Sequence, residues 1–154
     1  MRLQNFEISS SIELQSAGLF WDLHNFARFL GLEIIPAENI ALMSWSVPKG
    51  PNPWGCNENK FAGMKLRFTG LQVIRLSPRD PDLPLTEDIC VSEILKVDPR
   101  VDHADPHMRA VWEMTDRFHL AISFQSRRMI ELGSEAVELI PVSGDSFVEP
   151  RAQR

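Results

Sequence analysis

The stretch "FHLAISF", residues 118–124, decides the fold class. Its large apolar side chains occupy every second position, Phe118, Leu120, Ile122 and Phe124. Alternation with a period of two predicts a half-buried strand. Residues 129–132 (MIEL) follow after a short polar turn, and Gly133-Ser134 separates them from residues 136–140 (AVELI). These connections are too short for helical crossovers, so the pattern predicts a three-stranded antiparallel meander.

The middle of the chain shows the same alternation of apolar and polar residues. Residues 65–68 (KLRF) alternate, Thr69-Gly70 predicts a turn or a bulge, and residues 71–76 (LQVIRL) resume as extended chain. After the proline-rich loop "SPRDPDLPL", residues 77–85, residues 89–97 again alternate. A helix beginning at Thr86 is the competing interpretation. We favour the strand because Ile89, Val91 and Val97 are β-branched.

The first third is less regular. Phe26, Leu30, Leu32 and Ile34 fit one face of a strand, and residues 40–47 would return beside it after a turn at residues 36–39. The spacing of apolar residues in 19–30 also fits a short helix. We therefore expect a mainly β protein, either an antiparallel β-sandwich or a strongly bent sheet, with about seven to eight strands and one or two short helices. Residues 1–141 form one predicted domain, and residues 142–154 form a polar C-terminal tail.

Composition restricts the classes of protein to consider. The chain has 154 residues, of which 44% are hydrophobic and 24% charged, as in an ordinary globular domain. No apolar run approaches the roughly 18 residues that a membrane helix needs, and the N-terminus lacks the apolar core of a secretory signal. Two cysteines do not make a disulfide framework. We expect a cytoplasmic bacterial protein without a membrane partner.

Negative charge is concentrated in one segment. The net charge of the chain is −5, and residues 80–105 hold eight acidic and two basic residues, a local charge of −6. Such a segment repels nucleic acid and attracts a basic protein or a cation. The predicted contact residues are Asp80, Asp82, Glu87 and Asp88. Their spacing matches no EF-hand loop, and the alternative is that they solvate a long surface loop.

Two groups of residues are candidates for chemistry. The segment "HADPH" offers His103, Asp105 and His107 as ligands for zinc or iron, because alternate residues of an extended chain project to one side. Cys56 with His24 and Asp22 would make a nucleophile, a base and an orienting group, although nothing near Cys56 predicts a lowered thiol pKa. No glycine-rich phosphate loop occurs, and we expect no cofactor.

A second long loop, residues 48–62, carries Trp54 among amide side chains. Trp54 with Asn57 and Asn59 is typical of a loop that binds a carbohydrate or a peptide, since the ring stacks and the amides give directional hydrogen bonds. The alternative is a loop that Trp54 pins to the core.

Three segments in this order resemble the small β-rich immunity proteins of bacterial polymorphic toxin systems. They are "FWDLHNFARFLGLEI", "MKLRFTGLQVIRL" and the late hairpin "FHLAISFQSRRMIELGSEAVELIP", and together they cover about half of the chain. Asp22 and Leu23 stand where the pattern usually has Pro or Ser, and the loops around Trp54 and Asp80 are insertions.

The resemblance implies a non-enzymatic protein that binds another protein, such as a basic toxin domain, whose encounter the acidic segment would speed. It also implies that Trp21 anchors the core or an edge while Asp22 and His24 hold the backbone. A small-molecule or carbohydrate-binding module and a metal-dependent enzyme that uses the HADPH segment are the alternatives. Homo-oligomerisation stays open.

Overall fold

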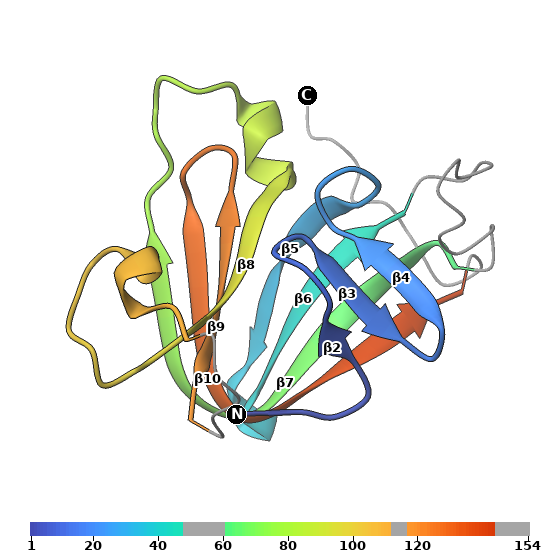
Figure 1. Ribbon diagram of the computed structural model, residues 1–154. Helices are drawn as coiled ribbons and strands as arrows, with labels where there is room; N and C mark the ends of the chain where they lie inside the picture. The colour runs from blue at the N-terminus through green and yellow to red at the C-terminus, as the bar shows by residue number, and fades with distance from the viewer. Residues whose placement is uncertain (48–60, 112–116, 144–154) are drawn as a thin grey trace.

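The computed structural model describes residues 1–47, 61–111 and 117–143. Within them the protein is mainly β (Figure 1). The strands are β1 (Arg2–Leu3), β2 (Glu7–Ile8), β3 (Glu13–Ser16), β4 (Leu19–Asp22), β5 (Arg28–Ile35), β6 (Ile40–Ser46), β7 (Gly63–Ser77), β8 (Val91–Val97), β9 (His119–Phe124) and β10 (Met129–Val142). Short 3-10 helices occupy η1 (Pro36–Glu38), η2 (Leu85–Ile89) and η3 (Pro106–Arg109).

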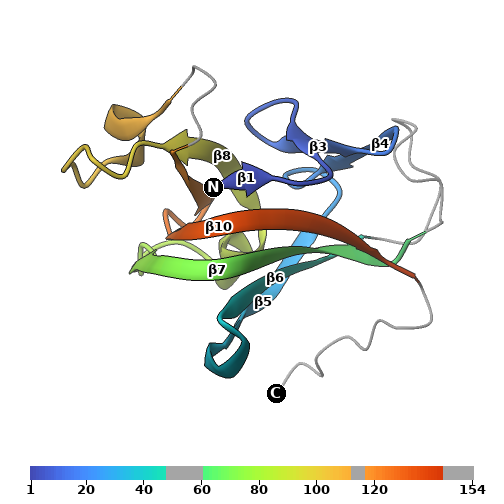
Figure 2. The same ribbon diagram turned by 90° about the horizontal axis from the view of Figure 1, so that it is seen from below.

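One large sheet dominates the structure. Its strand order is β5-β6-β7-β10-β9-β8, all antiparallel, and β1 adds to β10 in parallel. Figure 2 shows β10 between β1 and β7. A second sheet, β2-β3-β4, lies beside the large one (Figure 1).

The large sheet is strongly bent because two long strands belong to both of its halves. β6 pairs only with the first part of β7, up to Thr69, whereas β9 pairs with β10 only over Met129–Leu132. Between these parts the β7–β10 register shifts at Gly133/Ser134, and Gly70 has a φ of +65°. Bulges of this kind increase twist and let a strand pass from one sheet direction to another. The predicted bent-sheet class is confirmed.

The predicted meander was wrong in one respect. Gly133-Ser134 does not separate two strands, since β10 runs through it without a break. For Thr69-Gly70 the sequence left a turn or a bulge open, and the structure excludes the turn, since both residues lie within continuous β7. β7 and β10 stay paired with each other on both sides of these glycines, so neither strand ends there. Each glycine instead allows its strand to bend.

Residues 19–30 contain no helix, so that alternative was also wrong. Leu19–Asp22 is β4, which pairs with β3 and places Trp21 opposite Leu14, both buried. In β5 the bulge between Phe29 and Gly31 shifts the alternation, so Phe29 enters the core and Ile34 is exposed. The single-sided face predicted from Phe26 to Ile34 is therefore broken at the bulge.

Both interpretations of residues 86–97 hold in part. Residues 85–89 form the 3-10 helix η2, and the predicted strand starts only at Val91. Ile89 therefore lies outside the strand and is exposed. A register shift between Val91 and Glu93 places Val91 and Ile94, three positions apart, in the same core, and Leu95 is buried on the opposite face of the sheet.

The main core fills the concave side of the bent sheet beneath the β3–β4 hairpin. Phe29 contacts Phe124 and Trp45, with ring centroids 4.8 and 5.3 Å apart. Burying each such side chain contributes about 1.5–3 kcal/mol to folding. A smaller cluster, Leu95, Val97 and Ala121 with Ala110 and Met129, lies on the other face of β8, β9 and β10. We call that side the outer face.

Candidate functional site

The outer face carries a buried ion cluster around Glu131. Its side chain is 0% exposed and accepts hydrogen bonds from the two terminal guanidinium nitrogens of Arg109, Nη1 at 3.2 Å and Nη2 at 2.6 Å. His119 Nδ1 lies 2.7 Å from Glu131 Oε1, and Arg75 Nη1 lies 3.3 Å from it. An ionised carboxylate only accepts, so all three neighbours donate to it.

This cluster fastens residues 98–111 to the sheet. Asp98 N donates to Arg109 O, and Val111 N donates to Lys96 O, both at 2.8 Å, so the segment returns along the edge of β8. Burial acts to raise the pKa of Glu131, but the hydrogen bonds from Arg109 and His119 and the charges of Arg109 and Arg75 outweigh it and lower the pKa. The carboxylate is thus held ionised.

A Glu–His pair can in principle orient a catalytic base. Here His119 Nε2 packs on the backbone, because a Cβ built on Gly133 would lie 2.5 Å from it. This ring nitrogen is turned toward a strand, and the pair acts as part of the attachment of residues 98–111.

The HADPH segment is not extended, although the metal prediction assumed that it was. Asp105 is the N-cap of η3, where its Oδ1 accepts from His107 N at 2.9 Å. His103 Nδ1 accepts from Asp105 N at 3.0 Å, and His107 Nε2 lies 3.2 Å from Glu93 Oε2. In the described ranges, no group of three or more His, Cys, Asp and Glu side chains is placed to hold a metal ion.

His24 meets a cysteine that sequence reasoning did not select. Cys56 lies outside the described residues, whereas Cys90 Sγ is 3.8 Å from His24 Nδ1. That nitrogen also lies 2.6 Å from Val91 O, which can only accept, so Nδ1 carries a proton and cannot deprotonate the thiol. Burial, and then the charges of Glu87 and Asp22, raise the pKa of Cys90, which keeps it a thiol.

Asp22 serves the backbone, as expected. Its Oδ1 accepts from His24 N at 2.9 Å and from Asn25 N at 2.8 Å. Trp21 is buried beside it. The structural roles predicted for Trp21, Asp22 and His24 are confirmed, because His24 in turn ties this turn to β8.

The acidic loop is braced by arginines. We call residues 80–89 the braced loop. Arg79 Nε lies 3.1 Å and Arg128 Nη2 lies 3.4 Å from the carboxylate of Asp88, and Arg127 Nη1 lies 3.1 Å from Asp80 Oδ2. Burial acts to raise the pKa of Asp88, but hydrogen bonds from Ser126 and Arg79 and the charges of both arginines lower it.

Backbone contacts brace the same loop from the β9–β10 turn. Asp80 N donates to Ser126 O at 2.8 Å, and Ser126 N donates to Glu87 O at 3.2 Å. Arg79 Nη2 also donates to Leu83 O. The contacts of Ser126 with Asp80 and Glu87 join residues 46 and 39 positions apart in sequence, and together with the local contact of Arg79 they hold the loop in one conformation.

The braced loop therefore differs from the strongly acidic surface that the sequence predicts. Two of its four carboxylates, those of Asp80 and Asp88, meet three guanidinium groups, so the four acids and the three arginines together carry a net charge of −1. Asp82 and Glu87 take no side-chain ion pair within the described part of the chain. Beside them Leu85 is 74% exposed and Ile89 is 37% exposed. Figure 1 shows this segment projecting beyond the ends of β8, β9 and β10.

Sequence reasoning missed Leu85 and the arginines. "SRR" at residues 126–128 in a predicted turn, together with Arg79 inside the acidic run, was the available signal. Trp54, Asn57 and Asn59 lie outside the described residues, so the prediction for that loop stays a prediction.

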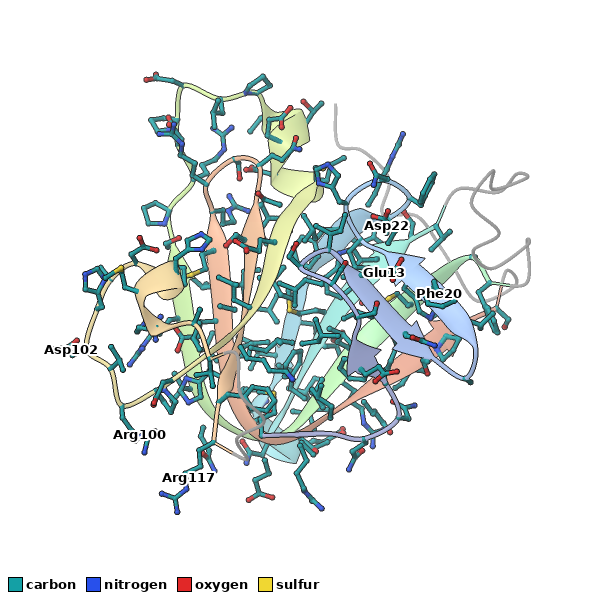
Figure 3. The ribbon with its side chains drawn as sticks, viewed as in Figure 1. Glu13, Phe20, Asp22, Arg100, Asp102 and Arg117 are labelled. Atoms are coloured by element: carbon teal, nitrogen blue, oxygen red, sulfur yellow. The ribbon has the colours of Figure 1, made fainter. Side chains whose placement is uncertain are left out.

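Two further surface groups are visible in Figure 3. Glu13 and Asp22 are opposite each other on the outward side of the β3–β4 hairpin, with Phe20 nearby at 39% exposure. Arg100, Asp102 and Arg117 extend at the other end of the molecule. Arg100 is held by Asp98, with Nη2 2.6 Å from Oδ2.

A pocket of about 240 Å³ lies between the N-terminal segment and the edge of β8. Ile8, Ser11, Glu93, Leu95 and Val111 are among its lining residues. Pockets for small ligands usually enclose about 300–1,000 Å³. This pocket is smaller, and neither the Glu131–His119 pair nor the His24–Cys90 pair lines it.

Comparison of the chain with protein-family models, with curated proteins and with solved structures finds no match. Among the described helices, none is long and apolar enough to cross a membrane.

Proposed function

We propose that this chain is a non-enzymatic domain that binds another protein through the braced loop. The observation that carries the proposal is the combination of a projecting, exposed Leu85 with a loop backbone fixed by Arg79, Arg127 and Arg128. A loop already ordered in its binding conformation loses little entropy on association. Interfaces commonly centre on such an apolar anchor with polar groups around it.

The side chains that could act as catalytic bases or nucleophiles also support a non-enzymatic role. Glu131 and His119 attach residues 98–111, His24 Nδ1 donates to a carbonyl, and Cys90 is held as a thiol. Each of these side chains is thus engaged in holding the fold together.

Charge contributes less to this contact than the sequence suggested. Asp80 and Asp88 already have internal partners, so a basic partner would meet mainly Asp82 and Glu87. We propose that Leu85 supplies the affinity and that these two acids steer and orient the partner.

The resemblance to immunity proteins suggests a toxin domain as the partner. In that case the chain, produced together with the toxin, would protect a bacterial host from it. Loss of the contact through Leu85 would then remove protection without unfolding the chain.

Site-specific crosslinking tests the proposal. A photoreactive residue at position 85 should capture a defined protein in cells of the source organism, whereas the same residue at Met108, which is 65% exposed on another loop, should not. The captured protein, once purified, should bind the wild type and lose at least about tenfold in affinity with Leu85→Asp, which corresponds to about 1.4 kcal/mol. Met108→Asp is the matched control. Equal capture from both positions, or unchanged affinity in Leu85→Asp, would count against the proposal.

A further inference from the structure

The pocket at the edge of β8 lies between two backbone contacts. β8 is the last strand of the large sheet, and other segments of the chain cover its free edge on both sides of the pocket. Ile94 N donates to Ser11 O at 2.5 Å, and Val111 N donates to Lys96 O at 2.8 Å. All four of these residues line the pocket, whose volume is about 240 Å³.

The same two contacts show which backbone groups face the pocket. In an antiparallel strand the N–H and C=O of one residue point to the same side, and successive residues alternate. Ile94 and Lys96 therefore both point away from β9, toward the free edge. The C=O of Ile94 and the N–H of Lys96 remain there, and neither has a hydrogen-bond partner within residues 1–47, 61–111 and 117–143. The pocket thus offers one backbone acceptor and one backbone donor.

The spacing of these two groups fits one amino-acid residue. In parallel pairing, a residue opposite Leu95 donates its N–H to the C=O of Ile94 and accepts from the N–H of Lys96. The contacts of Ser11 and Val111 occupy the edge on either side, so the gap leaves room for one residue and not for a long strand. The small volume agrees, since pockets for larger ligands enclose about 300–1,000 Å³.

The two ends of the pocket differ in charge. Glu93, which precedes Ile94, also lines the pocket and places a carboxylate near the acceptor end. An ammonium group has three donors and a positive charge, so it matches Ile94 O and Glu93 better than an amide N–H does. At the other end the donor is the backbone N–H of Lys96, because the Lys96 ammonium lies over the Phe118 ring, 5.3 Å from its centroid.

The walls indicate the kind of side chain that the pocket accepts. Residues opposite each other in parallel strands place their side chains on the same face, so a bound residue would lie beside Leu95 on the outer face. Ala110 and Val111 line this pocket as well. These apolar neighbours favour a small apolar side chain.

We propose that this pocket binds an α-amino acid residue that has a free ammonium group and a small apolar side chain. The ammonium donates to Ile94 O and to the Glu93 carboxylate, and the carbonyl oxygen accepts from Lys96 N–H. Either a free amino acid or the N-terminal residue of a peptide supplies this chemistry, and capture of an N-terminal amine is a recurring mode of recognition. This inference is independent of the protein partner of the braced loop.

NMR titration of the labelled chain with L-valine and with L-valine methylamide tests the proposal. A ligand with so few atoms binds weakly, so we expect a dissociation constant of about 0.1–1 mM and a saturable shift of the Lys96 amide resonance. Binding of L-valine alone assigns the site to a free amino acid, whereas binding of the methylamide as well extends it to a peptide N-terminus. No saturable shift at Lys96 with either probe, up to about 20 mM, overturns the proposal.

Two analogues test the two ends of the pocket without changing the protein. N-acetyl-L-valine lacks the ammonium group, and isobutylamine lacks the carbonyl group. Each should bind at least tenfold more weakly than L-valine. Equal affinity of N-acetyl-L-valine or of isobutylamine overturns the arrangement.

A charge variant tests the role of Glu93. Glu93→Gln should weaken the binding of L-valine at least tenfold, while the amide resonances far from the pocket stay in place. Glu33→Gln is the matched control, since it removes the same charge from an exposed position on β5, and it should bind as the wild type does. Unchanged affinity in a folded Glu93→Gln variant overturns the assignment of the ammonium to this carboxylate.

Discussion

Removing Arg109 tests whether the ion cluster holds residues 98–111 on the sheet. Arg109→Met leaves Glu131, which is 0% exposed, without its bidentate partner at 2.6 and 3.2 Å. Breaking a buried ion pair from one side costs about 3–5 kcal/mol. His119 at 2.7 Å and Arg75 at 3.3 Å still contact the carboxylate, so we expect the lower end, about 3 kcal/mol. For a chain of this size that loss lowers Tm by about 6–12 °C.

Urea unfolding followed by tryptophan fluorescence at pH 7 measures the change in the free energy of unfolding. The matched control is Arg100→Met in the same segment, since Arg100 pairs with Asp98 at 2.6 Å but its side chain is 70% exposed. Exposed pairs contribute little, and we expect no measurable change for this variant. An effect of Arg109→Met no larger than that of Arg100→Met would refute the reasoning.

The pH dependence supplies a second measurement on the same variant. The pKa of Glu131 is lowered in the folded protein from an ordinary value of 4.5, although burial by itself would raise it. A lowered folded-state pKa gives stability that is present above the unfolded-state pKa and is lost as the pH falls through the folded value. The stability difference between the wild type and Arg109→Met should therefore narrow below about pH 4.5. A constant difference down to acidic pH would contradict this assignment.

Four further outcomes are expected. Gly133→Ala forces His119 to move and should cost about 1–3 kcal/mol in urea unfolding, whereas His119→Ala combined with it should recover part of that loss. Asp88→Asn should lower the free energy of unfolding by about 1 kcal/mol, while Asp82→Asn, on the same loop, should leave it unchanged. Asp22→Ala removes the acceptor of two backbone N–H groups and should cost about 1–3 kcal/mol, measured by thermal unfolding. In a Cys56→Ser background, Cys90 should react with a thiol reagent more slowly than a free cysteine at neutral pH, because its pKa is raised; reaction at the free rate would show the thiol to be unperturbed.

The candidate contact surface could be located from the sequence but not described. The acidic run at Asp80–Asp88 and its proline-rich setting are visible in one dimension. The net charge of this loop depends in part on Arg127, which contacts Asp80 from 47 positions away in the sequence. No local pattern predicts such a pair, and without it the loop would be taken as a bare negative patch.

The sequence by itself determined that this chain is mainly β, since alternation of apolar side chains is a local property that each strand carries, as in residues 118–124. Only the tertiary structure decided whether Gly70 and Gly133 end a strand or bend it, because a glycine allows both and the neighbouring strand selects one. The tertiary structure likewise decided which polar and charged side chains are paired with other groups of the protein. Glu131 and Arg109 are 22 positions apart, and His24 reaches β8 across 67, so their pairing exists only once the sheet has closed around them.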